Sequence, residues 1–189
     1  MLPWGHLALG YLLYSGLSRV WRHHSPPATG TVALAVGTQF PDLVDKPLAW
    51  WFGVLPDGRS LGHSLLVGVV VLLALRQVAK ASGRGREWVA FALGYLSHLF
   101  GDTLSPLVQL DLRELGFLGW PLVPAVADDH TGGIVAHFAN LDVGVPFWAE
   151  FGLALLALGV WYREGAPGLR LCWQWVLYSL GVDEVSTPR

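Results

Sequence analysis

Six apolar stretches make up most of this chain, and they constrain its fold more than any other feature. A helix that spans a bilayer needs about 20 apolar residues, within a range of about 17–25. The third, fourth and fifth stretches are long enough, whereas the others either tilt, form a re-entrant pair or pack beneath their neighbours. The pattern predicts an all-α, polytopic membrane bundle of five to six helices. The stretches cover approximately residues 7–20, 28–40, 61–79, 88–104, 143–162 and 169–182.

The low content of charged residues supports a membrane protein. The chain is 53% hydrophobic and only 14% charged, whereas a soluble domain is about 45–50% apolar and about 25% charged. Ten Trp and five Tyr residues suit the aromatic belts of membrane interfaces. The net charge of −2 gives no reason to expect a nucleic-acid partner. Cys172 is the only cysteine, which excludes an intramolecular disulfide and a cysteine-based zinc site.

The chain shows no internal repeat and no domain linker, so residues 1–189 are predicted to form a single membrane-embedded domain. The break at residues 105–142 contains three prolines and several glycines. Loops longer than about 12–15 residues are uncommon unless they have a role. We therefore expect this loop to cap a functional site.

The distribution of basic residues predicts an orientation. If the six stretches alternate in direction, one face receives eight of the twelve basic residues and only two acids. Lys and Arg are enriched in cytoplasmic loops, so that face is predicted to be cytoplasmic and the protein to be a multi-pass protein of the cell membrane. The connections on this face are residues 18–27, 76–87 and 163–170.

Several ionisable residues fall at the opposite, non-cytoplasmic ends of the first four stretches. His98 and Asp102 are four residues apart, so they share one face of a helix. Ionisable groups at membrane depth are functional candidates by default. The alternative for this pair is a hydrogen bond between helices that fixes their packing. The other members of the group are His6, Asp42, Asp45 and His63.

Each of these other residues also has a simpler interpretation. Pro41 is expected to end the second helix, and Asp42 after it would cap the next segment or lie in a solvated turn. Asp45 could bridge a second metal ion or pair with Lys46. His6 and His63 could be interfacial residues at helix starts, and Gly62 beside His63 would let a metal or substrate approach the backbone.

Taken together, three imidazoles and two or three carboxylates form a mixed nitrogen and oxygen set that suits zinc, manganese or ferrous iron. Helical bundles commonly build metal sites from side chains on different helices. The sequence therefore predicts a divalent-metal site at one end of the bundle, with zinc favoured and one to three ions. Asp42 and Asp45 are the catalytic candidates, either bridging two ions or acting as general base.

The same residues carry a resemblance to a known family. The succession His6, Gly37-x-x-x-Pro41-Asp42-x-x-Asp45, Gly62-His63-Ser64 and Gly94-x-x-Ser97-His98-x-x-x-Asp102, followed by Trp120-Pro-Leu122, resembles the membrane-bound metal-dependent hydrolases of bacteria and archaea, a family that includes the LexA-regulated inner-membrane protein. More distantly it is similar to zinc-dependent phospholipase C and single-strand nuclease. The resemblance covers about the first 125 residues and implies that the metal ligands are His6, Asp42, His63, His98 and Asp102.

The later histidine ligands of the soluble enzymes have no clear counterpart here. Asp128, Asp129 and His130 in the long loop are additional candidates, either as ligands or as a general base. Their alternative is a solvated turn before Gly132 and Gly133.

The predicted function is hydrolysis in the membrane by metal-activated water. The resemblance implies a phosphate ester or a phospholipid as substrate, with membrane lipid as the partner. One alternative is a metal or proton transporter, although a transport path needs ionisable groups at successive depths and these gather at one end. The other alternative is a structural membrane protein whose polar residues only fix helix packing.

Overall fold

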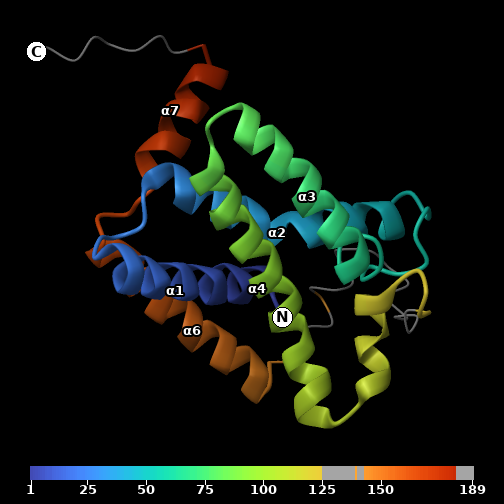
Figure 1. Cartoon of the computed structure of the whole chain (residues 1–189). Helices are drawn as coiled ribbons and strands as arrows, with labels where there is room; N and C mark the ends of the chain where they lie inside the picture. The colour runs from blue at the N-terminus through green and yellow to red at the C-terminus, as the bar shows by residue number, and fades with distance from the viewer. Residues whose placement is uncertain (125–138, 140–142, 182–189) are drawn as a thin grey trace, which may run out of the picture.

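The computed structural model describes residues 1–124, 139 and 143–181. Within these residues the fold is all helical, which confirms the predicted class. Figure 1 shows α2 and α4 crossing at the centre, with α3 beside α4 and with α1 and α6 on the other side. The elements are α1 (Pro3–Arg22), α2 (Ala28–Trp50), α3 (Leu65–Ala81), α4 (Gly85–Gln109), the 3-10 helix η1 (Leu112–Gly119), α6 (Val145–Arg163) and α7 (Leu169–Ser179).

Glycines allow the central pair of helices to pack with their backbones in contact. A Cβ atom added at Gly37 of α2 would clash with the Phe91 carbonyl of α4, and one added at Gly94 of α4 would clash with the Leu34 carbonyl of α2. Small residues at crossings let helices approach closely in membrane bundles. The crossing therefore fixes how the residues that follow on each helix face one another.

The prediction that Pro41 ends the second helix is wrong. α2 continues through both Pro41 and Pro47 to Trp50. A proline inside a helix removes one backbone hydrogen bond and usually kinks the helix without ending it when packing holds both halves. Asp42 and Asp45 consequently lie inside α2, and both are buried. The predicted loop at 105–142 also begins late, because α4 runs through Pro106 to Gln109.

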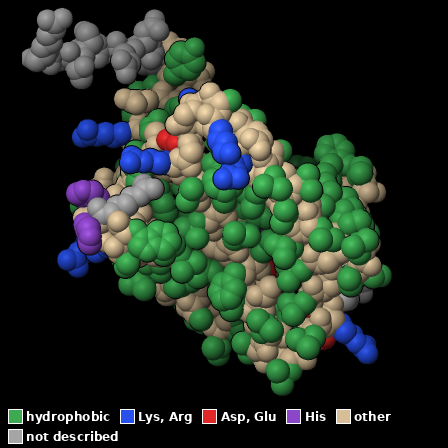
Figure 2. All heavy atoms as spheres, in the orientation of Figure 1, with side chains coloured by type: hydrophobic (Ala, Val, Ile, Leu, Met, Phe, Trp, Pro, Cys, Tyr) green, Lys and Arg blue, Asp and Glu red, His purple; other side chains and the backbone are tan. Residues whose placement is uncertain are grey.

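Polar side chains are buried while apolar side chains face outward. Among the described residues, fourteen polar or charged side chains are buried, compared with nine hydrophobic ones. Large apolar side chains are exposed along α3, α6 and α7. In Figure 2, hydrophobic side chains cover most of the visible face, and Lys and Arg side chains gather mainly at its upper left. An exterior of this kind fits a surface in contact with lipid.

One helix of the described chain is long and apolar enough to cross a membrane. It is α6, with a mean hydropathy of 1.4 and only 6% of its residues buried. α3 is apolar but has 17 residues, and α2 and α4 carry the buried ionisable groups. The prediction of five to six spanning helices is therefore not supported by helix length and composition.

Candidate metal centre

The five predicted ligands come together just beyond the crossing of α2 and α4, toward the C-terminal ends of both helices. Asp42 belongs to α2, His98 and Asp102 to α4, and His6 to α1. His63 lies in the turn just before α3, where Ser64 caps the helix by accepting the Val67 N–H. All five residues are buried, and none is more than 9% exposed. Four separate segments of the chain thus contribute to one cluster of imidazoles and carboxylates.

Three ligand atoms have the mutual spacing expected around one metal ion, and an oxygen of Asp42 lies beside two of them. His63 Nε2 lies 3.1 Å from His98 Nε2 and 3.3 Å from Asp102 Oδ2, and the last two atoms are 3.5 Å apart. Asp42 Oδ1 lies 3.4 Å from His63 Nε2 and 3.8 Å from His98 Nε2. Atoms bound tetrahedrally at about 2.0–2.1 Å lie roughly 3.3–3.4 Å from one another. The spacing of His63, His98 and Asp102 therefore fits a single ion such as zinc.

In His63 and His98, a hydrogen bond to the outer ring nitrogen, Nδ1, directs the inner nitrogen, Nε2, toward the cluster. His98 Nδ1 contacts the Thr38 carbonyl at 2.5 Å, and His63 Nδ1 contacts Asp45 Oδ2 at 2.8 Å. Each outer nitrogen must carry hydrogen to make its bond, which leaves Nε2 for a cation. Two such nitrogens 3.1 Å apart repel one another unless a proton or a metal ion lies between them.

The acids around His63 favour a positive charge at this position. Burial by itself lowers the pKa of the His63 imidazole, but hydrogen bonds with Asp102, Asp42 and Asp45 outweigh burial and raise that pKa to about 10. Opposite charges at close range stabilise the charged form of a titratable group. The cluster is thus built to hold a cation.

Asp45 lies behind His63. Its two oxygens accept hydrogen bonds from the backbone N–H groups of Ser60, Gly62 and His63 at 2.8, 2.6 and 3.2 Å, in addition to the His63 ring. It is fully buried. The structure therefore places Asp45 where it holds the turn that carries His63. The predicted partner of Asp45, Lys46, instead contacts Asp42 Oδ2 at 2.6 Å.

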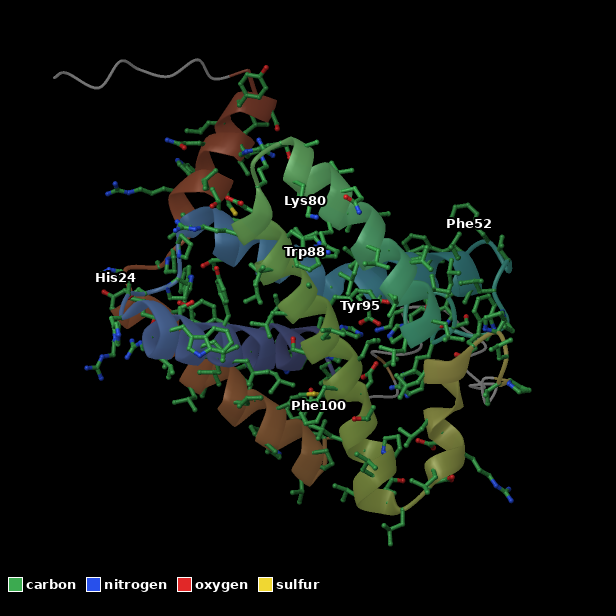
Figure 3. All side chains as sticks on the ribbon, viewed as in Figure 1. His24, Phe52, Lys80, Trp88, Tyr95 and Phe100 are labelled. Carbon is green, nitrogen blue, oxygen red and sulfur yellow. The ribbon has the colours of Figure 1, made fainter. Side chains whose placement is uncertain are left out.

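Gly62 allows this turn to approach α2. A Cβ atom added there would lie 2.9 Å from the Pro41 carbonyl and 3.2 Å from Asp45 Oδ1. The close approach expected at Gly62 is thus made by α2 of the same chain. Tyr95 of α4, which Figure 3 shows near the centre of the fold, donates its hydroxyl hydrogen to the Gly62 carbonyl at 2.6 Å. The turn is held from both helices.

Replacing Asp45 with asparagine is expected to weaken zinc binding by about 10–100-fold, the usual effect of losing a partner that orients a ligand. The asparagine cannot accept all four hydrogen bonds, so His63 loses its fixed orientation although no ligand residue is replaced. Competition with a zinc-binding dye measures the change. Asp111→Asn, an exposed substitution at the start of η1, serves as the control. A loss as complete as that of a ligand variant would contradict this role.

His6 forms a second, overlapping ligand set with His98 and Asp102. Its ring stacks on that of His98, with ring centroids 3.6 Å apart, and its Nε2 lies 3.3 Å from Asp102 Oδ1. The two oxygens of Asp102 therefore face different histidines. His6 Nδ1 is buried without a hydrogen-bond partner. His6 is positioned either to orient Asp102 or to bind a further ion.

The described part of the predicted capping loop contacts the cluster. Phe117 of η1 is buried and packs edge-on against the His63 ring, with centroids 6.1 Å apart. Ser64 donates its hydroxyl hydrogen to the Trp120 carbonyl at 2.5 Å. No sequence pattern indicates that η1 covers His63, since Phe117 lies in an ordinary apolar segment. Asp128, Asp129 and His130 lie outside the described residues.

Comparisons with known proteins bear on the family resemblance seen in the sequence. No curated protein and no solved structure matches the chain. The model of one protein family, described as the YdjM inner membrane protein, matches residues 1–183. This match confirms the resemblance to a family of inner membrane proteins, and its description names no reaction, so hydrolysis stays a prediction. Because the match covers nearly the whole chain, the protein belongs to the YdjM inner membrane protein family.

Proposed function

We propose that this protein is a metal-dependent hydrolase of the inner membrane. The observation that carries the proposal is the close spacing of three buried ligand atoms, from His63, His98 and Asp102, with Asp42 Oδ1 beside both histidines. Such a mixed nitrogen and oxygen set suits zinc best, and also manganese or ferrous iron.

Asp42 differs from the other three ligands in a way that favours catalysis over a purely structural ion. It lies furthest from His98 and is the most exposed of the five, at 9%. Catalytic zinc sites commonly use three protein ligands and leave one position open. His63, His98 and Asp102 would then hold the ion, and Asp42 would lie at the open side.

When bound, a divalent cation would lower the pKa of water in the site toward about 7 and polarise the bond to be cleaved. In this arrangement Asp42 accepts the proton of the attacking water as general base. Asp45 keeps His63 in place, and Phe117 excludes solvent from its ring. As substrate we propose a phosphate ester or a phospholipid.

The exterior of the molecule supports membrane lipid as the partner. An apolar groove of about 450 Å³ lies between α1, α2 and α6, and no metal-centre ligand lines it. Trp4, Leu7 and Leu158 are among the residues that do. We further propose a multi-pass arrangement with the ligands at the non-cytoplasmic side, because the basic residues follow the opposite ends of the helices.

A proton or metal transporter is the second candidate. It is favoured by polar groups of α1 beyond His6, where the buried Tyr11 and Ser15 and the exposed Arg19 donate hydrogen bonds to Glu164 at the end of α6. These groups provide ionisable positions at a second depth, as a transport path requires. Ion flux into proteoliposomes in the absence of ester cleavage would favour this function.

Replacing Asp42 with asparagine tests the hydrolase directly. We expect the metal content to persist and turnover of a chromogenic phosphodiester or a fluorescent phospholipid to fall by about 100-fold or more, the contribution of a general base. Elemental analysis and hydrolysis assays on the same detergent-purified sample measure both. His24→Ala, an exposed residue far from the cluster in Figure 3, is the control. Wild-type protein that binds metal but cleaves neither ester would refute hydrolysis of these substrates.

A further inference from the structure

Two basic side chains reach the metal centre from different elements. Lys46 of α2 contacts Asp42 Oδ2 at 2.6 Å, and Nε of Arg59, in the segment between α2 and α3, lies 3.7 Å from Asp102 Oδ2. The Lys46 side chain is 21% exposed and that of Arg59 is 38% exposed, whereas Asp102 is only 3% exposed. Both cations therefore contact the ligands and also reach the surface.

Lys46 is held at this position from its other side as well. Its ammonium group lies 5.7 Å from the ring centroid of Trp50, one helical turn further along α2. A cation over a tryptophan face is attracted to the ring. The aromatic ring and the Asp42 carboxylate together fix the Lys46 ammonium group at the accessible edge of the cluster.

The balance of charge explains what these cations can do. Three carboxylates, those of Asp42, Asp45 and Asp102, meet three cationic groups, because the amino group of Met1 also contacts Asp102 Oδ1, at 2.9 Å. A divalent ion would add further positive charge to this set, and a site with net positive charge in a partly desolvated setting attracts anions. The acceptor oxygens of a phosphoryl group match both an ammonium and a guanidinium group.

We propose that Lys46 and Arg59 bind the phosphoryl oxygens of an anionic substrate, and do so only when a divalent ion occupies the cluster. This inference rests on the proposed metal-dependent function and names the residues that select its substrate. The phosphoryl group can belong to a lipid headgroup or to a soluble ester. Lys46 exchanges its contact with Asp42 for one with the phosphoryl oxygen, which frees Asp42 to accept a proton.

Titration of inorganic phosphate into the zinc-loaded, full-length protein tests the proposal by calorimetry. We expect binding to the loaded protein, none after treatment with EDTA, and weakening by about 10–100-fold in Lys46→Met and Arg59→Met, the effect of losing a charge-assisted hydrogen bond. Lys46→Arg should retain binding because it keeps the charge. Lys80→Met, an exposed lysine at the far end of α3 in Figure 3, should leave binding unchanged.

Metal content measured on every sample separates the two proposals. A protein with full zinc occupancy that ignores phosphate overturns the anion site and leaves the metal centre intact, whereas a wild-type protein that takes up no metal overturns the proposed function. Equal phosphate binding with and without zinc, or in Lys46→Met and the wild type, also overturns the anion site. Competition between phosphate and a short-chain phosphatidic acid then assigns the source, since a lipid substrate should bind more tightly.

Discussion

Replacing His98 with alanine is expected to abolish metal binding, with the affinity for zinc falling by more than about 100-fold, beyond the effect of losing an orienting partner. His98 belongs to both ligand sets of the cluster. Its Nε2 lies within 3.8 Å of ligand atoms of Asp42, His63 and Asp102. Its removal therefore takes away a ligand atom that both sets share and leaves a cavity beside His6. Elemental analysis after purification measures the metal content.

The His24→Ala control should retain the metal content of the wild type, because His24 is exposed and distant from the cluster. Circular dichroism of His98→Ala shows whether its helices persist. A folded His98→Ala protein with full zinc occupancy would contradict the ligand assignment. A folded variant without zinc would agree with it.

Replacing Gly94 with valine is expected to destabilise the protein by about 3 kcal/mol or more, at the upper end of the usual cost of overpacking. The new side chain would meet the Leu34 carbonyl of α2, and the Thr38 backbone nitrogen would lie 2.9 Å from its Cβ. Neither backbone atom can move without shifting a whole helix. Because α2 carries Asp42 and α4 carries His98 and Asp102, separation of the helices should also reduce zinc binding, although no ligand is changed.

Thermal unfolding in detergent, followed together with metal content, checks this prediction. Gly159→Val is the matched control, since a Cβ atom at Gly159 of α6 has no other atom within 4 Å. The control should unfold near the temperature of the wild type. If the two variants were equally stable, the α2 and α4 crossing would not have the close packing described.

Local spacing explains why the ligand positions could be predicted from sequence. His98 and Asp102 lie one turn apart on a helix, a relation that the 3.6-residue period makes visible without any tertiary information. The convergence of His6, Asp42 and His63 on this pair was an inference from their shared end of the layout, and the structure brings them together. Their role as metal ligands stays a prediction.

Roles that depend on tertiary contacts could not be predicted in this way. Asp45 holds a turn 15 to 18 residues later in the chain, and no local pattern reports such a pairing. Pro41 predicts the end of a helix because proline disfavours the helix interior. Packing against α4 nevertheless keeps α2 continuous. The prediction that polar groups gather at one end also missed Tyr11 and Ser15, which bind Glu164. These side chains are uncharged, so nothing marks them as polar partners within an apolar stretch.

The attachment of α6 has a mechanical consequence. Among the described helices, α6 packs mainly against α1. Hydrogen bonds join the two near both ends, from the Leu2 backbone N–H to Glu150 and from Ser15 to Glu164. His6 lies between these two attachment points. A change in the tilt of α6, such as a thicker membrane can cause, therefore acts directly on the helix that bears His6.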